Sequence, residues 1–140
     1  MVILDTNILS ALMKAQPDPV VMGWLDRQSS AALRTTSVNV FEVRFGLARM
    51  EAGRRRTALI ESFSAMLVED LGGAGLELDD RAADVAAIIA AEREAVGRPV
   101  DFRDTAIAAI AVRYDATLVT RNLRHFAGLP IPVISPWGAE

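Results

Sequence analysis

Short apolar segments alternate with helix-length segments along this chain, and this alternation restricts the fold more than any other feature. The first apolar run, 2–4, is too short for a helix and stops at Asp5-Thr6-Asn7, where Thr6 or Asn7 is expected to cap a helix reaching about Lys14. Further strands are expected at 33–36, 76–78, 116–120 and 131–134, and further helices at 20–28, 37–52, 58–71, 80–96 and 102–114. This order favours an α/β fold with a central, mostly parallel sheet of about four to five strands flanked by helices.

Length and composition exclude several classes of protein. The 140 residues suit a single domain, 1–140, and contain no cysteine, which excludes a disulfide scaffold, a thiolate zinc site and a thiol nucleophile. No uninterrupted apolar run exceeds seven residues, far below the ~20 needed to cross a bilayer. The N-terminal segment lacks the basic residues of a signal peptide. We therefore expect a cytoplasmic protein without a membrane partner.

The charge balance does not by itself predict a nucleic-acid partner. The net charge is −3, so the molecule as a whole would repel a polyphosphate. However, all basic residues except Lys14 are arginines, whose side chains form bidentate contacts with phosphate and carboxylate groups.

Asp5, Glu42 and Asp104 differ from the acids on solvated helix faces in their positions, and each also lacks a basic residue three or four positions away. Asp5 ends the first buried strand, Glu42 lies between two apolar faces of its helix, and Asp104 stands in the first turn of another helix. Each also has a structural explanation. Asp5 could cap a helix, Asp104 could interact favourably with the helix dipole, and Glu42 could pair with Arg49 two turns away.

The three acids would form one site if the fold brings them to one edge of the sheet. Two unit charges 4 Å apart repel by about 4 kcal/mol at an effective dielectric constant of 20. A cluster of that kind takes up protons or binds a cation, and oxygen ligands without His or Cys favour Mg²⁺ or Mn²⁺. Such ions suit phosphodiester hydrolysis. In parallel sheets the site lies outside the carboxyl ends of the strands, which directs attention to Asp5 and to Thr120-Arg121-Asn122.

Four motifs in order resemble one known family. They are Leu4-Asp5-Thr6-Asn7, the segment 36–47 that contains Glu42, the segment 104–111 that begins at Asp104, and Val119-Thr120-Arg121-Asn122. Together with the closing Pro136-Trp137, they resemble PIN-domain proteins, and in particular the FitB-like subgroup of VapC toxins, over essentially the whole chain.

The resemblance implies a three-layer α/β fold, a homodimer, a ribonuclease that depends on Mg²⁺ or Mn²⁺, and a cognate antitoxin that covers the acidic groove. Carried over to this sequence, it implies that Asp5, Glu42 and Asp104 are catalytic metal ligands and that Thr6 and Thr120 support them. Asn122 stands where many relatives have Asp, so the second metal position is open.

Two other residues near these motifs each allow two interpretations. Asp101 could replace the missing acid or simply cap its helix, and His125 could act as a base or pack in a loop. Trp137 is expected to pack the C-terminus down, and 54–56 (three arginines) are expected in a loop because positive charge disfavours a helix N-terminus.

Two alternative functions remain from the sequence. One is a PIN-fold binding module that mainly assembles with a DNA-binding antitoxin, which the neutral Asn122 favours. The other is a phospho-acceptor domain that uses Asp5. A receiver-type site needs an early acidic pair and a late lysine, and the only lysine is Lys14. A haloacid-dehalogenase-type site needs a second Asp two residues after the first, where this chain has Asn7.

Overall fold

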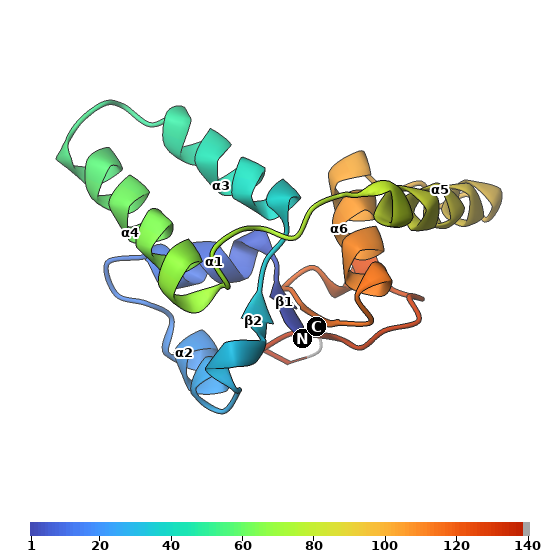
Figure 1. Cartoon of the computed structure of the whole chain (residues 1–140), viewed down its shortest axis with the longest axis horizontal. Helices are drawn as coiled ribbons and strands as arrows, with labels where there is room; N and C mark the ends of the chain where they lie inside the picture. Colours follow the sequence, from blue (N-terminus) through green and yellow to red (C-terminus); the bar gives the residue numbers. More distant parts are fainter. Residues whose placement is uncertain (139–140) are drawn as a thin grey trace.

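The computed structural model describes residues 1–138, which contain one four-stranded sheet with all strands parallel (Figure 1). The strands are β1 (Val2–Leu4), β2 (Leu33–Arg34), β3 (Thr117–Val119) and β4 (Val133–Ile134), in the order β2-β1-β3-β4. The expected parallel sheet of about four to five strands is therefore confirmed.

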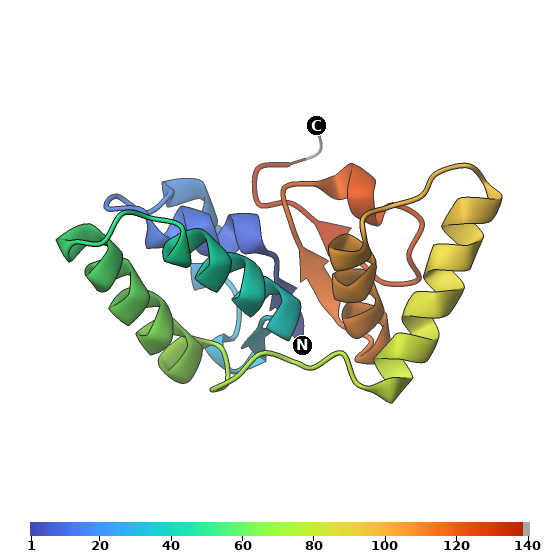
Figure 2. The same ribbon diagram turned by 90° about the horizontal axis from the view of Figure 1, so that it is seen from above.

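Helices cover both faces of this sheet. They are α1 (Thr6–Met13), α2 (Pro19–Asp26), α3 (Ser37–Ala48), α4 (Arg54–Asp70), α5 (Asp80–Ala95) and α6 (Phe102–Arg113), with short 3₁₀ turns η1 (Ser30–Ala32) and η2 (Leu123–Phe126). Figure 2 shows α1 to α4 on one side of the sheet and α5 with α6 on the other. The expected three-layer α/β architecture is confirmed.

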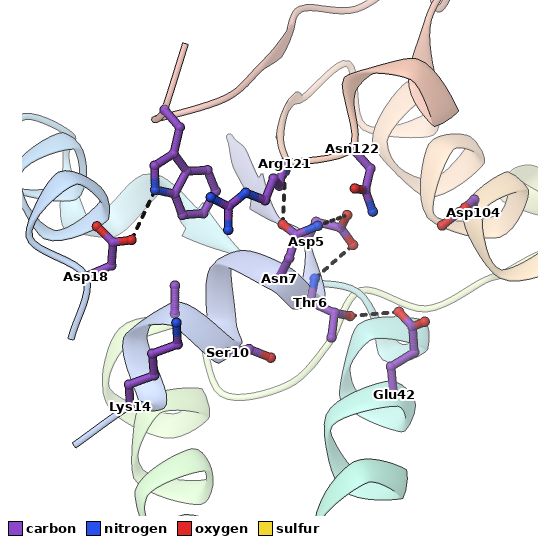
Figure 3. Close-up of a pocket in the computed structure, with 12 residues that line it drawn as sticks. Asp5, Thr6, Asn7, Ser10, Lys14, Asp18, Glu42, Asp104, Arg121 and Asn122 are labelled. Atoms are coloured by element: carbon purple, nitrogen blue, oxygen red, sulfur yellow. Dashed lines mark hydrogen bonds between the residues drawn. The ribbon is translucent and has the colours of Figure 1, made fainter. Parts of the chain in front are cut away.

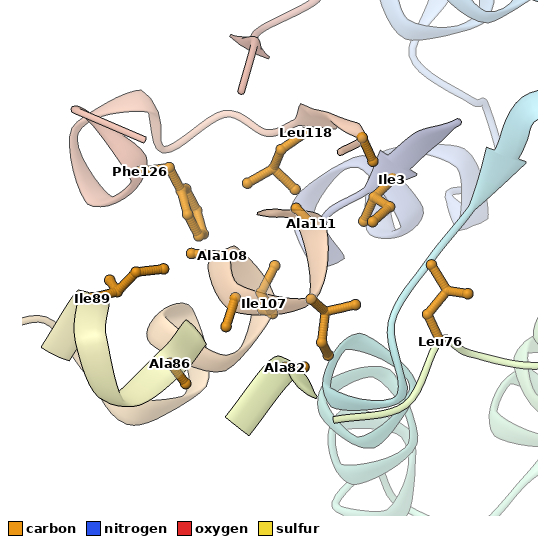
Figure 4. Close-up of a cluster of buried hydrophobic side chains, with 13 residues drawn as sticks. Ile3, Leu76, Ala82, Ala86, Ile89, Ile107, Ala108, Ala111, Leu118 and Phe126 are labelled. Atoms are coloured by element: carbon orange, nitrogen blue, oxygen red, sulfur yellow. The ribbon is translucent and has the colours of Figure 1, made fainter. Parts of the chain in front are cut away.

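The alternation of side chains along the central strands divides the core into two halves. Ile3 and Leu118 point into a cluster shared with α5 and α6, whereas their neighbours Leu4 and Val119 point into a cluster shared with α1, α3 and α4. Figure 4 shows the first cluster, where alanines of α5 and α6 face each other. Small side chains at this contact let the two helices approach closely.

Two expectations about helix starts are corrected by the cap geometry. Of the caps that the sequence offered for α1, Asp5 is the one observed, and Thr6 and Asn7 are not, because the Asp5 carboxylate accepts from the Thr6 amide at 2.8 Å. The sequence predicts Ser37 as the cap of α3, whereas the cap is Thr36, which exchanges hydrogen bonds with Asn39 in a capping box. Asp79 caps α5, and Asp101 caps α6, which is one of the two interpretations that the sequence allowed for Asp101.

The expected strand at 76–78 is wrong. Only Leu76 pairs, in a single parallel bridge with Thr36, because the chain at residue 37 turns into α3 and offers no further extended partner. The two β-type hydrogen bonds run from the Leu76 amide to the Thr35 carbonyl and from the Ser37 amide to the Leu76 carbonyl, both 2.9 Å long.

The expected loop at 54–56 is also wrong, because α4 begins at Arg54 and these arginines form its first turn. Unfavourable charge at a helix start costs about 0.3–1 kcal/mol per group. Burial of Phe63 and Leu67 on the same helix outweighs that cost.

Within the described residues, none of the helices is both long enough and apolar enough to traverse a lipid bilayer.

The close approach of Gly75 to the backbone of Thr36 and Ser37 gives a stability prediction. A Cβ there would lie 2.6 Å from the Ser37 nitrogen and 2.7 Å from the Thr36 carbonyl carbon. We expect Gly75→Ala to lower the free energy of unfolding by about 1–3 kcal/mol, as for other overpacked sites. Urea unfolding followed by circular dichroism measures the change.

Gly46→Ala is the matched control, because a Cβ in the middle of α3 meets nothing within 4 Å. This substitution should instead stabilise the protein by about 0.5–1 kcal/mol, through helix propensity. Equal effects of the two substitutions would contradict the packing role of Gly75.

Candidate functional site

The candidate site lies where the chain changes direction across the sheet. From β1 the chain passes to β2 on one side, and it later returns to β3 on the other side. The carboxyl ends of β1 and β3 are thus neighbours, joined by a 2.9 Å hydrogen bond from the Asp5 amide to the Val119 carbonyl. Ligands of parallel sheets bind at such a switch point.

Asp5 is the most buried acid of this site, with 5% of its surface exposed. One carboxylate oxygen accepts from the Thr6 amide and from Asn39 Nδ2 at 2.8 and 2.9 Å. The other accepts from Thr120 Oγ1 at 2.7 Å and from Asn7 Nδ2 at 3.4 Å. All these donors are neutral, and across residues 1–138 no basic side chain forms an ion pair with Asp5. Its orientation is fixed while its charge remains uncompensated.

Glu42 reaches the same place from α3. Its Oε1 accepts from Thr6 Oγ1 at 2.7 Å, and its Oε2 lies 3.7 Å from Arg103 Nη1 at the start of α6. Arg49, which the sequence offered as a partner, instead covers the Phe45 ring at 4.7 Å. The basic neighbour of Glu42 therefore comes from a distant part of the chain, and the pairing distance is long.

Asp104 faces the site from the first turn of α6. Its Oδ2 lies 3.0 Å from His125 Nδ1 in η2. The nearby Asp101 accepts a hydrogen bond from the Arg103 amide at 2.7 Å. Asp101 therefore caps the helix, which is one of the two interpretations that the sequence allowed.

Asp5, Glu42, Asp104 and Asn122 all line one cavity of about 450 Å³. Figure 3 shows these four side chains around a common space, each from a different element. The backbone N–H of Asn122 donates to Thr120 Oγ1 at 3.0 Å. Asn122 is thereby linked to the same hydroxyl that donates to Asp5. Of the six residues predicted for the site, five line this cavity, whereas Thr120 is fully buried and contacts Asp5 instead.

The carboxylates are spread around the cavity rather than packed into a tight cluster. Within residues 1–138, no three His, Cys, Asp or Glu side chains stand close enough together to form a ready-made metal site. Glu42 is directed toward Thr6 and Arg103, and Asp104 toward His125.

The acids nevertheless influence one another electrostatically. Burial raises the pKa of Glu42, and the charges of Asp5 and Asp104 raise it further, against the lowering effects of the Thr6 hydroxyl and Arg103. Burial likewise raises the pKa of Asp104; His125 lowers it, and Asp5 and Asp101 raise it. The raised pKa values identify carboxylates whose negative charge is poorly compensated by the protein alone.

The types of residue that line the cavity are those of a hard-cation site, although their carboxylates are not gathered around one point within residues 1–138. Three carboxylates and one side-chain amide line a single cavity, and the most buried carboxylate has only neutral hydrogen-bond donors. Mg²⁺ and Mn²⁺ prefer oxygen ligands of this kind. The neutral Asn122 adds an oxygen without adding charge.

Asn39 is a site residue that the sequence interpretation missed. It is fully buried, and its Nδ2 donates to Asp5 and, at 3.0 Å, to Thr6 Oγ1. Its Oδ1 accepts from the Thr36 hydroxyl at 2.7 Å. The spacing of Thr36 and Asn39 matches a capping box and could have drawn attention to it.

The far end of the cavity carries two basic side chains, of which Lys14 was not expected at the site. Lys14 and Arg121 line it, and the Arg121 guanidinium stacks on the Trp137 ring at 4.1 Å from the ring centre. Trp137 Nε1 donates to Asp18 Oδ2 at 3.1 Å, a bond marked in Figure 3, so Trp137 also packs the C-terminal segment as expected. This hydrogen bond is the main cause of the lowered pKa of Asp18.

Comparison with known proteins places this geometry in a family. The PIN domain model matches residues 2–130. VapC ribonuclease Y4jK of Sinorhizobium fredii is 36% identical over 98% of this chain and 98% of its own length. Toxin FitB of Neisseria gonorrhoeae is 28% identical over 98% of this chain and 99% of its own length.

The solved structures agree. The structure of FitAB bound to an IR36 DNA fragment contains a chain with a TM-score of 0.90 and 28% identity, covering 100% of this chain and 98% of that one. With a family model over nearly the whole chain and a relative of 36% identity, this protein belongs to the PIN domain family, within its VapC-type group.

Proposed function

We propose that this protein is a metal-dependent endoribonuclease and the toxin of a type II toxin–antitoxin pair. One observation carries the proposal: three acids and Asn122, from four separate elements, line a single cavity at the switch point of a PIN fold. The relationship to VapC ribonuclease Y4jK and to Toxin FitB supports RNA as the substrate and toxicity as the role.

Asp5, Glu42 and Asp104 are the residues that would hold Mg²⁺ or Mn²⁺, directly or through water. When bound, the ion supplies activation of a water molecule and stabilisation of charge on the leaving oxygen. The contribution of the chain is to hold the donors in place. Thr120 and Asn39 fix both oxygens of Asp5, and the Thr6 hydroxyl fixes Glu42.

Partners and location are part of the proposal. An antitoxin partner is supported by the resemblance to VapC toxins and by the similarity to a chain solved within FitAB on DNA. A second copy of the chain would cover Phe41 and Phe45 of α3, which are stacked on each other and 53% and 45% exposed. Since its substrate would be cellular RNA, we place the protein in the cytoplasm.

A catalytically weak module that mainly binds an antitoxin is the second candidate. The neutral Asn122 and the spread of the carboxylates around the cavity favour it. Metal binding and RNA cleavage distinguish the two functions.

Divalent ions should stabilise the folded protein. Because only the folded chain brings the three acids to one cavity, Mn²⁺ at about 100 times its Kd should add about 2.7 kcal/mol. This is several degrees in Tm for a domain of this size. Thermal unfolding with Mn²⁺, Mg²⁺ or EDTA measures the shift. Asp5→Asn should abolish it, and Asp115→Asn, in the turn before β3 and outside the cavity, should retain it. An identical shift in both variants would contradict the site.

Cleavage should depend on the same acids. We expect Asp104→Asn and Asp5→Asn each to lower kcat for RNA cleavage by about 100-fold or more, as for other groups that act electrostatically on a transition state. Gel analysis of labelled tRNA, rRNA and mRNA in Mn²⁺ or EDTA measures it, with Asp115→Asn as the active control. Cleavage that persists in EDTA and in Asp5→Asn would come from a contaminating nuclease.

The raised pKa of Glu42 predicts a pH-dependent stability effect in EDTA. Between the ordinary value of 4.5 and its raised value, the folded chain binds the Glu42 proton more strongly than the unfolded chain. Ionised Glu42 therefore destabilises the fold at neutral pH. Glu42→Gln should be more stable than the parent at neutral pH, and this advantage should vanish as the pH falls below about 4.5.

Urea unfolding at several pH values checks this expectation. Glu61→Gln, on an exposed position of α4, is the control and should change stability by less than about 0.5 kcal/mol. A Glu42→Gln variant that is less stable than the parent at neutral pH would overturn it.

A further inference from the structure

The acidic cavity continues into two further depressions along the loop that follows β3. The first of these, about 250 Å³, is lined by 121–125 alone and shares Arg121 and Asn122 with the acidic cavity. The second, about 580 Å³, lies between η2 and the α5–α6 connection and shares Arg124 and His125 with the first. The three depressions therefore adjoin one another along residues 121–125, and we refer to them together as the groove.

This groove is basic on both sides of the acids, in a molecule whose net charge is −3. Lys14 and Arg121 lie at one end, Arg124 follows, and Arg93 and Arg98 line the far depression. They are five of the 15 basic residues of the chain. Beyond the three site acids, the carboxylates that line the groove are Asp18 and Glu92, one at each end.

Most of these cations are not neutralised by an ion pair in the part of the chain that the structure describes. Within residues 1–138, Arg98, Arg121 and Arg124 have no carboxylate within 4.0 Å. The Arg121 guanidinium lies over the Trp137 ring, and an arginine stacked in this way can still donate hydrogen bonds from its edge. Arg93 differs, because its Nη2 donates to the Ala127 carbonyl at 3.1 Å and so joins α5 to the loop.

The far depression also has an apolar lining, formed by Ile89, Val96, Val100 and Leu129. Positive groups beside an apolar surface suit a strand whose phosphates meet arginines and whose unstacked bases contact the apolar wall. A duplex hides its bases and cannot use that wall. His125 stands between the two regions, since its Nδ1 contacts Asp104 while its side chain lines the far depression.

We propose that this groove is the path of single-stranded RNA, which crosses the acids and continues past Asn122 and His125 to Arg98. The proposal rests on the proposed nuclease function for the identity of the substrate. It adds the course of the strand over the protein surface and two residues that position the strand, Arg98 and Arg124. It also accounts for RNA binding by an acidic protein, because the attraction comes from a local series of arginines rather than from the net charge.

RNA binding without cleavage tests the path. Fluorescence anisotropy of a labelled single-stranded RNA of about 12 nucleotides, in EDTA, measures Kd over a range of KCl concentrations. Arg98→Gln and Arg124→Gln should each weaken binding about fivefold near 0.1 M salt and reduce the salt slope by about 0.7, the value for one lost phosphate contact with a single strand. The duplex of the same sequence should bind more weakly and respond little to either substitution.

Arg27→Gln and Arg81→Gln are matched controls, because both arginines are exposed and lie outside the groove. Each removes the same charge and should change Kd less than twofold. The proposal is overturned if groove and control variants weaken binding equally, or if neither pair affects it.

Cleavage kinetics separate this proposal from the proposed function. With Mn²⁺, Arg98→Gln/Arg124→Gln should raise KM and leave kcat nearly unchanged, which a merely misfolded variant would not do. Arginine-dependent RNA binding without any cleavage would support the path and refute the nuclease. Metal-dependent cleavage with unchanged KM in the double variant would support the nuclease and refute the path.

Discussion

The burial of the Asp5 carboxylate at the end of β1 is the constraint on which the rest of the site depends. A buried carboxylate without a cation needs hydrogen bonds, and here they come from Thr6, Asn39 and Thr120. These donors belong to α1, to α3 and to the end of β3, so the same bonds tie together the strands and helices around the cavity. The fold thus fixes the orientation of Asp5 and leaves its charge for a ligand to neutralise.

The two halves of the core meet at this point. The sheet separates the cluster under α5 and α6 from the cluster under α1, α3 and α4, and the acids arrive from both sides: Glu42 with α3 and Asp104 with α6. Burial and the charge of Asp5 raise the pKa of both carboxyl groups. Such a site stores unfavourable electrostatic energy that a divalent ion would relieve, which is the physical basis of the proposed function.

The sequence was sufficient for the features that depend on local patterns. The parallel sheet followed from alternating segments. Asp5, Glu42 and Asp104 were recognisable from their positions at a strand end, between two apolar helix faces and in a first helical turn, and from the motifs that contain them. Features set by distant contacts were missed. Arg103 beside Glu42, the burial of Asn39 and the groove beyond His125 all arise from segments that meet only in the fold. The wrong strand at 76–78 has the same cause, since pairing depends on where α3 begins. The metal-binding roles themselves stay predictions.

The most direct test of the central claim is the position of Mn²⁺ in crystals of this protein, measured by its anomalous scattering. A shared ion predicts an anomalous peak within coordination distance of oxygens from Asp5 and from at least one of Glu42 and Asp104. A map from fully loaded crystals that shows no peak in this cavity, or peaks only on other surface carboxylates, would contradict the account.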